Sequence, residues 1–325
     1  SKYCSTKYGI TTTSGTTALH LALKAGGIGK GDEVIIPDFT MAAVLFAVLY
    51  CGAKPVFVDA EPDTWNIDAA KIEEKITPGT AAILPVHTYG HPVDMDPIMK
   101  LAEKYGLLVI EDSAEAHGAE YKNRKCGSMG NMGCFSFYAN KIITTGEGGM
   151  VVTSDPKLAE RSRYYKNLCF PLHGRRDYIH DELGYNYRMT NVVAALGLAQ
   201  LENICKFIEK RRNNAKLYNE LLKDVPGIQF PVEKEYAKNV YWMYGIVVNP
   251  KKFGMPRDKL MDNLREEGVD TRYFLKQLLR LKALEKSGIS GNGHYPVTES
   301  LSANGLYLPS GSGLKPSDIE YICSK

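Results

Sequence analysis

The chain has 325 residues, of which 44% are hydrophobic and 24% are charged, and its formal net charge is +3. This length and composition predict a globular protein with one large and one smaller domain, and the small charge argues against nucleic acid or a membrane surface as a partner. The seven cysteines form no C-x-x-C pair, which argues against a metal site or a disulfide framework. Neither a signal peptide nor an apolar run of about 18 residues is found, so we expect a cytoplasmic location.

The first part of the chain alternates short apolar runs with segments of helical periodicity. The predicted strands are 9–12, 33–36, 55–58, 81–86, 107–112, 134–137 and 150–153. Helical periodicity is found between them at 16–26, 41–52, 68–76 and 95–106. Alternating strands and helices predict an α/β fold with a mainly parallel sheet of seven strands.

The later part of the chain is predicted to be richer in helices. Residues 155–167 read as a helix, 168–185 as a loop, and 190–222 as a long helix or a helix pair. This last segment would lead into a smaller C-terminal α+β domain with a strand inside 241–249. The predicted domains are therefore a large one over 1–222 and a small one over 223–325.

The first chemical signal is Ser14-Gly15-Thr16-Thr17, which follows the first predicted strand and opens a helix. Free backbone N–H groups and the helix dipole favour an anion there, and glycine lets the anion approach closely. A simple serine or threonine helix cap is the alternative interpretation.

The second signal is Glu111-Asp112 at the end of an apolar strand, where ligands bind to parallel sheets. A carboxylate there could hold a cationic partner, or Asp112 could simply cap the next segment. Glu115 and His117 follow in the same loop, and His117 on its own is more easily explained as a structural residue.

The third signal is Lys141, which follows a strand-like aromatic run containing Ser136 and precedes the turn sequence TTGEGG. Burial there would lower the pKa of the amine and free its lone pair, although a lysine at a strand end can also simply extend to the solvent. A phosphate site, a strand-end carboxylate and a desolvated lysine on one sheet together match what pyridoxal 5′-phosphate requires.

Several long motifs extend this interpretation over nearly the whole sequence. They are SGTTALHLAL, GDEVIIPDFT, GAKPVFVDAEPDTWNID, HTYGHPVDMD, VIEDSAEAHGA, FSFYANKIITTGEGGMVVT and GYNYRMTNVVAALGLAQLE. Through them the chain resembles the pyridoxal-phosphate sugar aminotransferases of the DegT/DnrJ/EryC1/StrS family. The segments NKIITTGEGGMVVT and GYNYRMTN are most similar to its perosamine synthase group. The resemblance implies a fold-type I pyridoxal-phosphate transferase.

The resemblance assigns the cofactor-binding roles by position. It implies that Lys141 forms the Schiff base with the cofactor and moves protons to and from the substrate carbon, and that Asp112 pairs with the pyridinium nitrogen. It also implies that Gly15, Thr16 and Ser136 hold the phosphate.

Further roles follow from the same resemblance. Glu115 would lie near the ring hydroxyl of the cofactor and His87 at a strand end close to it. Met41 stands where many relatives have an aromatic residue stacked on the pyridine ring, and its sulfur can still pack there. Asn186 and Arg188 belong to a segment that reaches the active site of a neighbouring subunit, which implies a homodimer with shared sites.

The implied reaction transfers an amino group from L-glutamate to the 4-keto carbon of a GDP-linked 4-keto-6-deoxy sugar, for use in a surface polysaccharide. Lys141 favours this activity over that of a related dehydratase branch with histidine at the same position. The alternatives are a 3- or 4-keto sugar carried by UDP or dTDP, and a non-catalytic family member. Residues 272–288 differ from the Pro/His-rich run of perosamine synthases and leave the sugar open.

Overall fold

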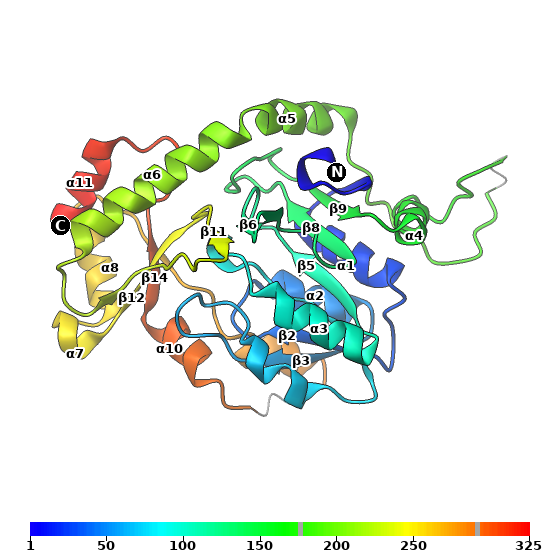
Figure 1. Ribbon diagram of the computed structural model, residues 1–325, viewed down its shortest axis with the longest axis horizontal. Coiled ribbons are helices and arrows are strands. Elements are labelled where there is room, and N and C mark those ends of the chain that lie inside the picture. The colour runs from blue at the N-terminus through cyan, green and yellow to red at the C-terminus, as the bar shows by residue number, and fades with distance from the viewer. Residues whose placement is uncertain (175–177, 290–292) are drawn as a thin grey trace.

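The computed structural model describes residues 1–174, 178–289 and 293–325. Its main sheet contains β1 (Tyr8–Thr12), β2 (Glu33–Pro37), β3 (Lys54–Val58), β4 (Thr80–Ile83), β5 (Leu108–Asp112), β8 (Met132–Ser136) and β9 (Gly149–Thr153). The strands follow the order β1-β9-β8-β5-β4-β2-β3 (Figure 1). Only β9 runs against its neighbours β8 and β1, and the pairs from β8 to β3 are parallel. The predicted seven-stranded, mainly parallel sheet is therefore confirmed.

Helices cover both faces of this sheet, which is why its strands are apolar along their length. On one face lie α1 (Gly15–Ala25), α2 (Ala42–Tyr50) and α4 (Pro156–Lys166), which share a core with Ile110 and Val151. On the other face lies α3 (Met95–Tyr105), which packs with Ile83 and Val109.

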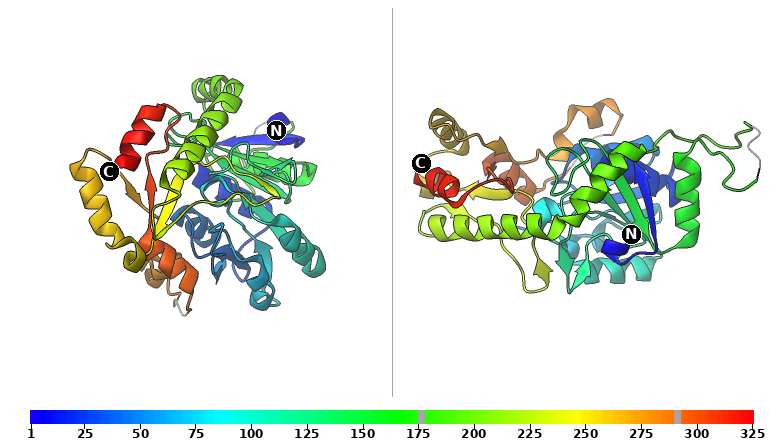
Figure 2. Two further views of the ribbon diagram at one scale, coloured as in Figure 1. Left: turned by 60° about the vertical axis from the view of Figure 1, so that its left-hand side comes forward. Right: turned by 90° about the horizontal axis from the view of Figure 1, so that it is seen from above.

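A helix pair connects the main sheet to the C-terminal elements. It consists of α5 (Asn191–Glu202) and α6 (Ile204–Leu222), and Asn203 interrupts it with φ −107° and ψ 4°. Of the two forms predicted for 190–222, the helix pair is the one observed. Figure 2 shows α6 crossing from the main sheet to the C-terminal elements. Within the described residues, no helix is both long and apolar enough to span a bilayer.

The C-terminal elements surround a second sheet with the order β10-β12-β14-β13. Its strands are β10 (Ile228–Gln229), β12 (Tyr244–Val248), β13 (Arg272–Tyr273) and β14 (Gly305–Leu308), with α7 (Pro250–Phe253), α8 (Arg257–Glu266), α10 (Pro296–Asn304) and α11 (Pro316–Ser324). α9 (Lys282–Lys286) lies instead against the main sheet, where its Leu284 joins the core around α1 and α2. β12 is the strand predicted within 241–249. Tyr218 of α6 packs in the same core as Tyr244 and Ile319. The domain boundary after residue 222 stays a prediction.

Two local features differ from the sequence analysis. Residues 68–76 form two short 3-10 helices, Ala69–Lys71 and Glu73–Lys75, in place of one α-helix. Ile72 is the fully buried apolar residue of this stretch, so little packing rewards a longer helix. A third sheet, formed by β6 (Glu120–Tyr121), β7 (Arg124–Lys125) and β11 (Ala237–Lys238), was not predicted, because two-residue strands show no alternation. Further 3-10 turns lie at Lys2–Cys4, Thr88–Gly90 and Leu278–Arg280.

Candidate active site

The start of α1 lies directly against the end of β8. A Cβ atom placed on Gly15 would lie 2.6 Å from Cβ of Ser136 and 3.0 Å from its Oγ. Only a glycine therefore allows the helix to approach the strand this closely, and the contact brings Gly15 and Ser136 together. Two of the three residues predicted to hold a phosphate are thus neighbours in space.

Ser14 caps α1 and leaves the first N–H groups of the helix free. Its Oγ accepts a hydrogen bond from the Thr17 N–H at 3.2 Å, and Thr17 Oγ1 accepts one from the Ser14 N–H at 2.9 Å. In the described part of the chain, the N–H groups of Gly15 and Thr16 have no acceptor. The cap interpretation is therefore confirmed. Free N–H groups at a helix N-terminus can also bind an anion, and that role of the stretch stays a prediction.

Asp112 ends β5 with its carboxylate almost buried, 4% exposed. Oδ1 accepts a hydrogen bond from the Ala114 N–H at 3.0 Å, whereas Oδ2 has no donor among the described residues. Burial raises the pKa of Asp112, and the positive charge of Lys141 opposes this shift. A cation that reached Oδ2 would lower the pKa again and hold the carboxylate ionised.

Glu115 is held close to Lys141 by a strained turn. Its Oε2 accepts a hydrogen bond at 2.7 Å from the N–H of Tyr89, a residue with a positive φ of 51°. Its Oε1 lies 4.0 Å from Nζ of Lys141. Burial raises the pKa of Glu115 to about 7, although Lys141 and the Tyr89 N–H act in the opposite direction. The carboxyl can therefore gain or lose a proton near neutral pH.

Lys141 is largely enclosed, with its side chain 11% exposed. Nζ lies 3.6 Å from the ring centroid of Trp242, and Trp242 Nε1 donates a hydrogen bond to the carbonyl oxygen of Asn140 at 2.8 Å. Burial lowers the pKa of the amine, and Glu115 and Asp112 partly oppose this. A neutral amine is a nucleophile and can carry a proton, which are the properties a covalent lysine needs.

Sequence analysis missed Trp242, because it lies 101 positions after Lys141 and no local motif connects the two. Gly90 is what lets it come near: a Cβ on Gly90 would lie 2.9 Å from the Trp242 backbone nitrogen. The sequence did offer one signal that could have singled out Trp242: tryptophan is rare in this chain, which has only two.

Met41 caps the N-terminus of α2, after the end of β2, and 54% of its surface is exposed. Among the predicted site residues, only Asn186 and Arg188 are exposed to the solvent in a similar way. Its side chain is free to pack against a bound ring or a second chain, and its role at the pyridine ring stays a prediction.

His87 makes hydrogen bonds through both ring nitrogens. The Val93 N–H donates to Nδ1 at 3.0 Å, which leaves Nε2 to donate to Glu111 Oε2 at 3.0 Å. Glu111 also accepts from the N–H groups of Gly127, Met129 and Gly130. The His87 N–H donates to the carbonyl of Asp112 at 3.1 Å. Any role of His87 towards a cofactor would therefore be to position Asp112, since its ring has no free nitrogen.

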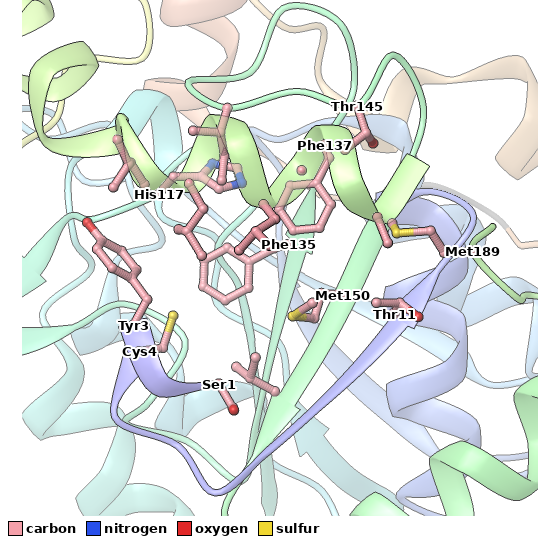
Figure 3. Close-up of a pocket in the computed structure, with 17 residues that line it drawn as sticks. Ser1, Tyr3, Cys4, Thr11, His117, Phe135, Phe137, Thr145, Met150 and Met189 are labelled. Atoms are coloured by element: carbon pink, nitrogen blue, oxygen red, sulfur yellow. The ribbon is translucent and has the colours of Figure 1, made fainter. Parts of the chain in front are cut away.

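His117 lies on the opposite face of the main sheet from the α1 site. Figure 3 shows it with Phe135 and Phe137 around an apolar cavity of about 230 Å³. These phenylalanines flank Ser136, and neighbouring residues of a strand point to opposite faces. Burial lowers the pKa of His117 to about 3, so the ring is neutral. The structural interpretation of His117 agrees with this position.

Asn186 and Arg188 lie apart from the other predicted residues within one chain. Asn186 forms an isolated bridge with Asn167, and Arg188 Nη1 donates a hydrogen bond to Asn167 Oδ1 at 2.9 Å. Both side chains lie near the surface of the single chain. Their predicted place in an active site would require a second chain.

The residues that do come together fit one cofactor. Free N–H groups at α1 and Ser136 would hold a phosphate, Asp112 Oδ2 would accept a hydrogen bond from a protonated ring nitrogen, and the Lys141 amine would bind an aldehyde. When bound, pyridoxal 5′-phosphate supplies an electron sink and a carrier for an amino group. The protein residues would orient it, with Trp242 covering the amine and with Lys141 Nζ and Glu115 as the groups that would exchange protons.

Comparison with known proteins confirms the predicted family and its cofactor. The model of the DegT/DnrJ/EryC1/StrS aminotransferase family matches residues 1–325. The GDP-perosamine synthase of Escherichia coli O157:H7 is 41% identical over 317 residues, which are 98% of this chain and 84% of that protein. The UDP-N-acetyl-3-dehydro-alpha-D-glucosamine 3-aminotransferase of Acidithiobacillus ferrooxidans is 39% identical over 319 residues, which are 98% of this chain and 83% of that protein.

A solved structure is similar throughout. The crystal structure of S. venezuelae DesV in complex with a ketimine intermediate superposes with a TM-score of 0.92 at 36% identity, over 99% of this chain and 85% of that one. The chain belongs to the DegT/DnrJ/EryC1/StrS aminotransferase family, and its cofactor is pyridoxal 5′-phosphate.

Proposed function

We propose that the protein transfers the amino group of L-glutamate to the 4-keto carbon of a GDP-linked 4-keto-6-deoxy sugar. The observation that carries the chemistry is the buried Lys141 amine beside Glu115, with Asp112 and the start of α1 on the same edge of the sheet. The similarity to GDP-perosamine synthase over 98% of the chain supports the choice of sugar nucleotide.

A second candidate is amination of a keto sugar carried by UDP or dTDP. The 39% identity to the Acidithiobacillus enzyme, whose name gives a UDP-linked substrate and position 3, supports it. The departure at residues 272–288 lies partly in β13 and in the Leu278–Arg280 turn, so sequence does not decide between the carriers.

The test compares carriers and donors side by side. The purified, cofactor-loaded protein is incubated with L-glutamate and with GDP-, UDP- or dTDP-linked keto sugars, and 2-oxoglutarate release and the aminated sugar are both measured. We expect the highest kcat/KM with the GDP-linked 4-keto sugar. A higher value with UDP or dTDP would establish the second candidate, and no cofactor uptake and no turnover would favour a non-catalytic member.

We also propose that two chains form each active site. α5 has no buried residue although its sequence is largely apolar, and Val192, Leu196 and Leu198 are 74%, 54% and 59% exposed. Apolar surface of this kind marks a protein interface. A twofold partner that covered α5 could bring its own Asn186 and Arg188 to Lys141, because both residues lie in the segment that leads directly into α5.

Mixed dimers test this arrangement. The variants Lys141→Ala and Arg188→Ala are each expected to be inactive or nearly so, and they are then unfolded together, mixed equally and refolded. Shared sites predict recovery of about a quarter of wild-type activity, since half of the dimers are mixed and each has one intact site. If both residues act within one chain, no mixed dimer contains an intact site and activity stays at the level of the parents.

A further inference from the structure

A charged cleft of about 460 Å³ opens beside Lys141. Its charged lining residues are Lys141, Arg211, Asp270 and Arg272, and Asp270 forms an ion pair with Arg272. The cleft therefore has more positive than negative charge, and an anionic ligand would balance it. Figure 1 shows α6, which carries Arg211, running from α5 across the C-terminal elements.

Arg211 is the unusual member of this lining. Its residue surface is 8% exposed, and Nη1 donates hydrogen bonds to the carbonyl oxygens of Trp242 and Ser310. Nε is buried without a partner, and Nη2 has none within the described residues. Nε and Nη2 form one edge of the guanidinium, and this edge offers the two parallel N–H groups that match a carboxylate.

No carboxylate of the described chain neutralises this guanidinium. Burial lowers the pKa of Arg211 to about 10, and no acidic group opposes the shift. A buried charge without a partner is costly, and a buried pair is tolerated only when its hydrogen bonds are complete. The neighbouring Arg212 shows the usual arrangement, because it is partly exposed and forms an ion pair with Glu233.

Trp242 connects Arg211 to the reacting amine. Its ring lies 3.6 Å from Lys141 Nζ, and its backbone oxygen accepts the Arg211 hydrogen bond. The guanidinium and the amine are therefore separated by one residue. In an amino acid the carboxylate is two bonds from the amino group, whereas in a sugar nucleotide the diphosphate at C1 lies across the ring from a keto group at C4.

We propose that Arg211 is the subsite that binds a carboxylate of the amino donor. This inference rests on the proposed function in one respect, namely that the donor is an amino acid. Arg211 also holds Trp242 in place, so donor binding at Arg211 and the position of the ring over Lys141 are connected.

The test measures anion binding separately from turnover. Glutarate, a dicarboxylate without an amino group, is titrated calorimetrically into the cofactor-loaded wild type and into three variants: Arg211→Gln, Arg211→Lys and Arg212→Gln. GDP is titrated into the same four proteins, as a probe for a site that binds the diphosphate of the sugar nucleotide. We expect Arg211→Gln to weaken glutarate binding by roughly 10- to 100-fold. Arg211→Lys should fall between it and wild type, and Arg212→Gln and all GDP titrations should stay within about threefold of wild type.

Several results would overturn the proposal. Glutarate binding unchanged in Arg211→Gln, absent in wild type, or weakened equally by Arg212→Gln would each contradict the subsite, and loss of GDP binding alone would assign Arg211 to the diphosphate. Circular dichroism shows whether Arg211→Gln is folded, and Arg211→Lys gives the answer if it is not. If no keto sugar is aminated but glutarate binding still depends on Arg211, the proposed acceptor fails and the subsite stands.

Discussion

Gly15→Ala should weaken cofactor binding through a steric effect alone. The new methyl group would lie 2.6 Å from Cβ of Ser136, 3.0 Å from its Oγ and 3.3 Å from its Cα. Reaching an ordinary contact requires the start of α1 to move by roughly 1 Å relative to β8. Such overpacking costs about 1–3 kcal/mol, which corresponds to a cofactor Kd about 5 to 150 times higher if the strain is relieved by giving up the phosphate contacts.

Titration of the apoprotein with pyridoxal 5′-phosphate, followed by visible absorbance, measures this change. Gly29→Ala is the matched control, since a Cβ atom placed on Gly29 would have no atom within 4 Å and the residue stands in a surface turn. We expect the control to bind like wild type. Wild-type affinity in Gly15→Ala would refute the reasoning that the phosphate lies at this helix start, and an equal loss in both variants would point to general instability.

Two further predictions concern the surroundings of Lys141. Trp242→Phe keeps a ring near the amine but removes the hydrogen bond to the Asn140 carbonyl. The free energy of unfolding, measured in urea, should therefore fall by about 1–3 kcal/mol. An unchanged free energy of unfolding would contradict this. Between pH 4.5 and about 7 the folded apoprotein keeps a proton on Glu115 that the unfolded chain has lost, so this group lowers the unfolding free energy as the pH rises. Glu115→Gln should therefore lose less stability than wild type between pH 5 and pH 8, and an identical difference would show that Glu115 is not responsible.

The main sheet was predictable because its signals are local. Apolar runs alternating with helical periodicity indicated the seven strands, and the motif around Lys141 placed the lysine after β8. The same holds for Asp112, since a carboxylate after a buried strand must lie at the ligand-binding edge. These inferences needed only the order of elements and the rule for where parallel sheets bind ligands.

What the sequence did not reveal depends on contacts between distant segments. Trp242 and Arg211 reach Lys141 only after the C-terminal elements pack against the main sheet. The involvement of both His87 nitrogens also needed the folded structure, because Val93 and Glu111 lie 6 and 24 positions away. The prediction of one α-helix over 68–76 was wrong. Ile72 is the fully buried apolar residue of this stretch, and so little packing does not stabilise a longer helix.

The most direct measurement is chemical labelling of the lysine. The protein is loaded with pyridoxal 5′-phosphate, reduced with borohydride, digested and analysed by mass spectrometry, with Lys141→Ala as the control. We predict a phosphopyridoxyl group on the peptide that contains Lys141, and none at a comparable level in the control. Labelling of another lysine in the wild type, or equal labelling of the variant, would contradict a covalent link between Lys141 and the cofactor.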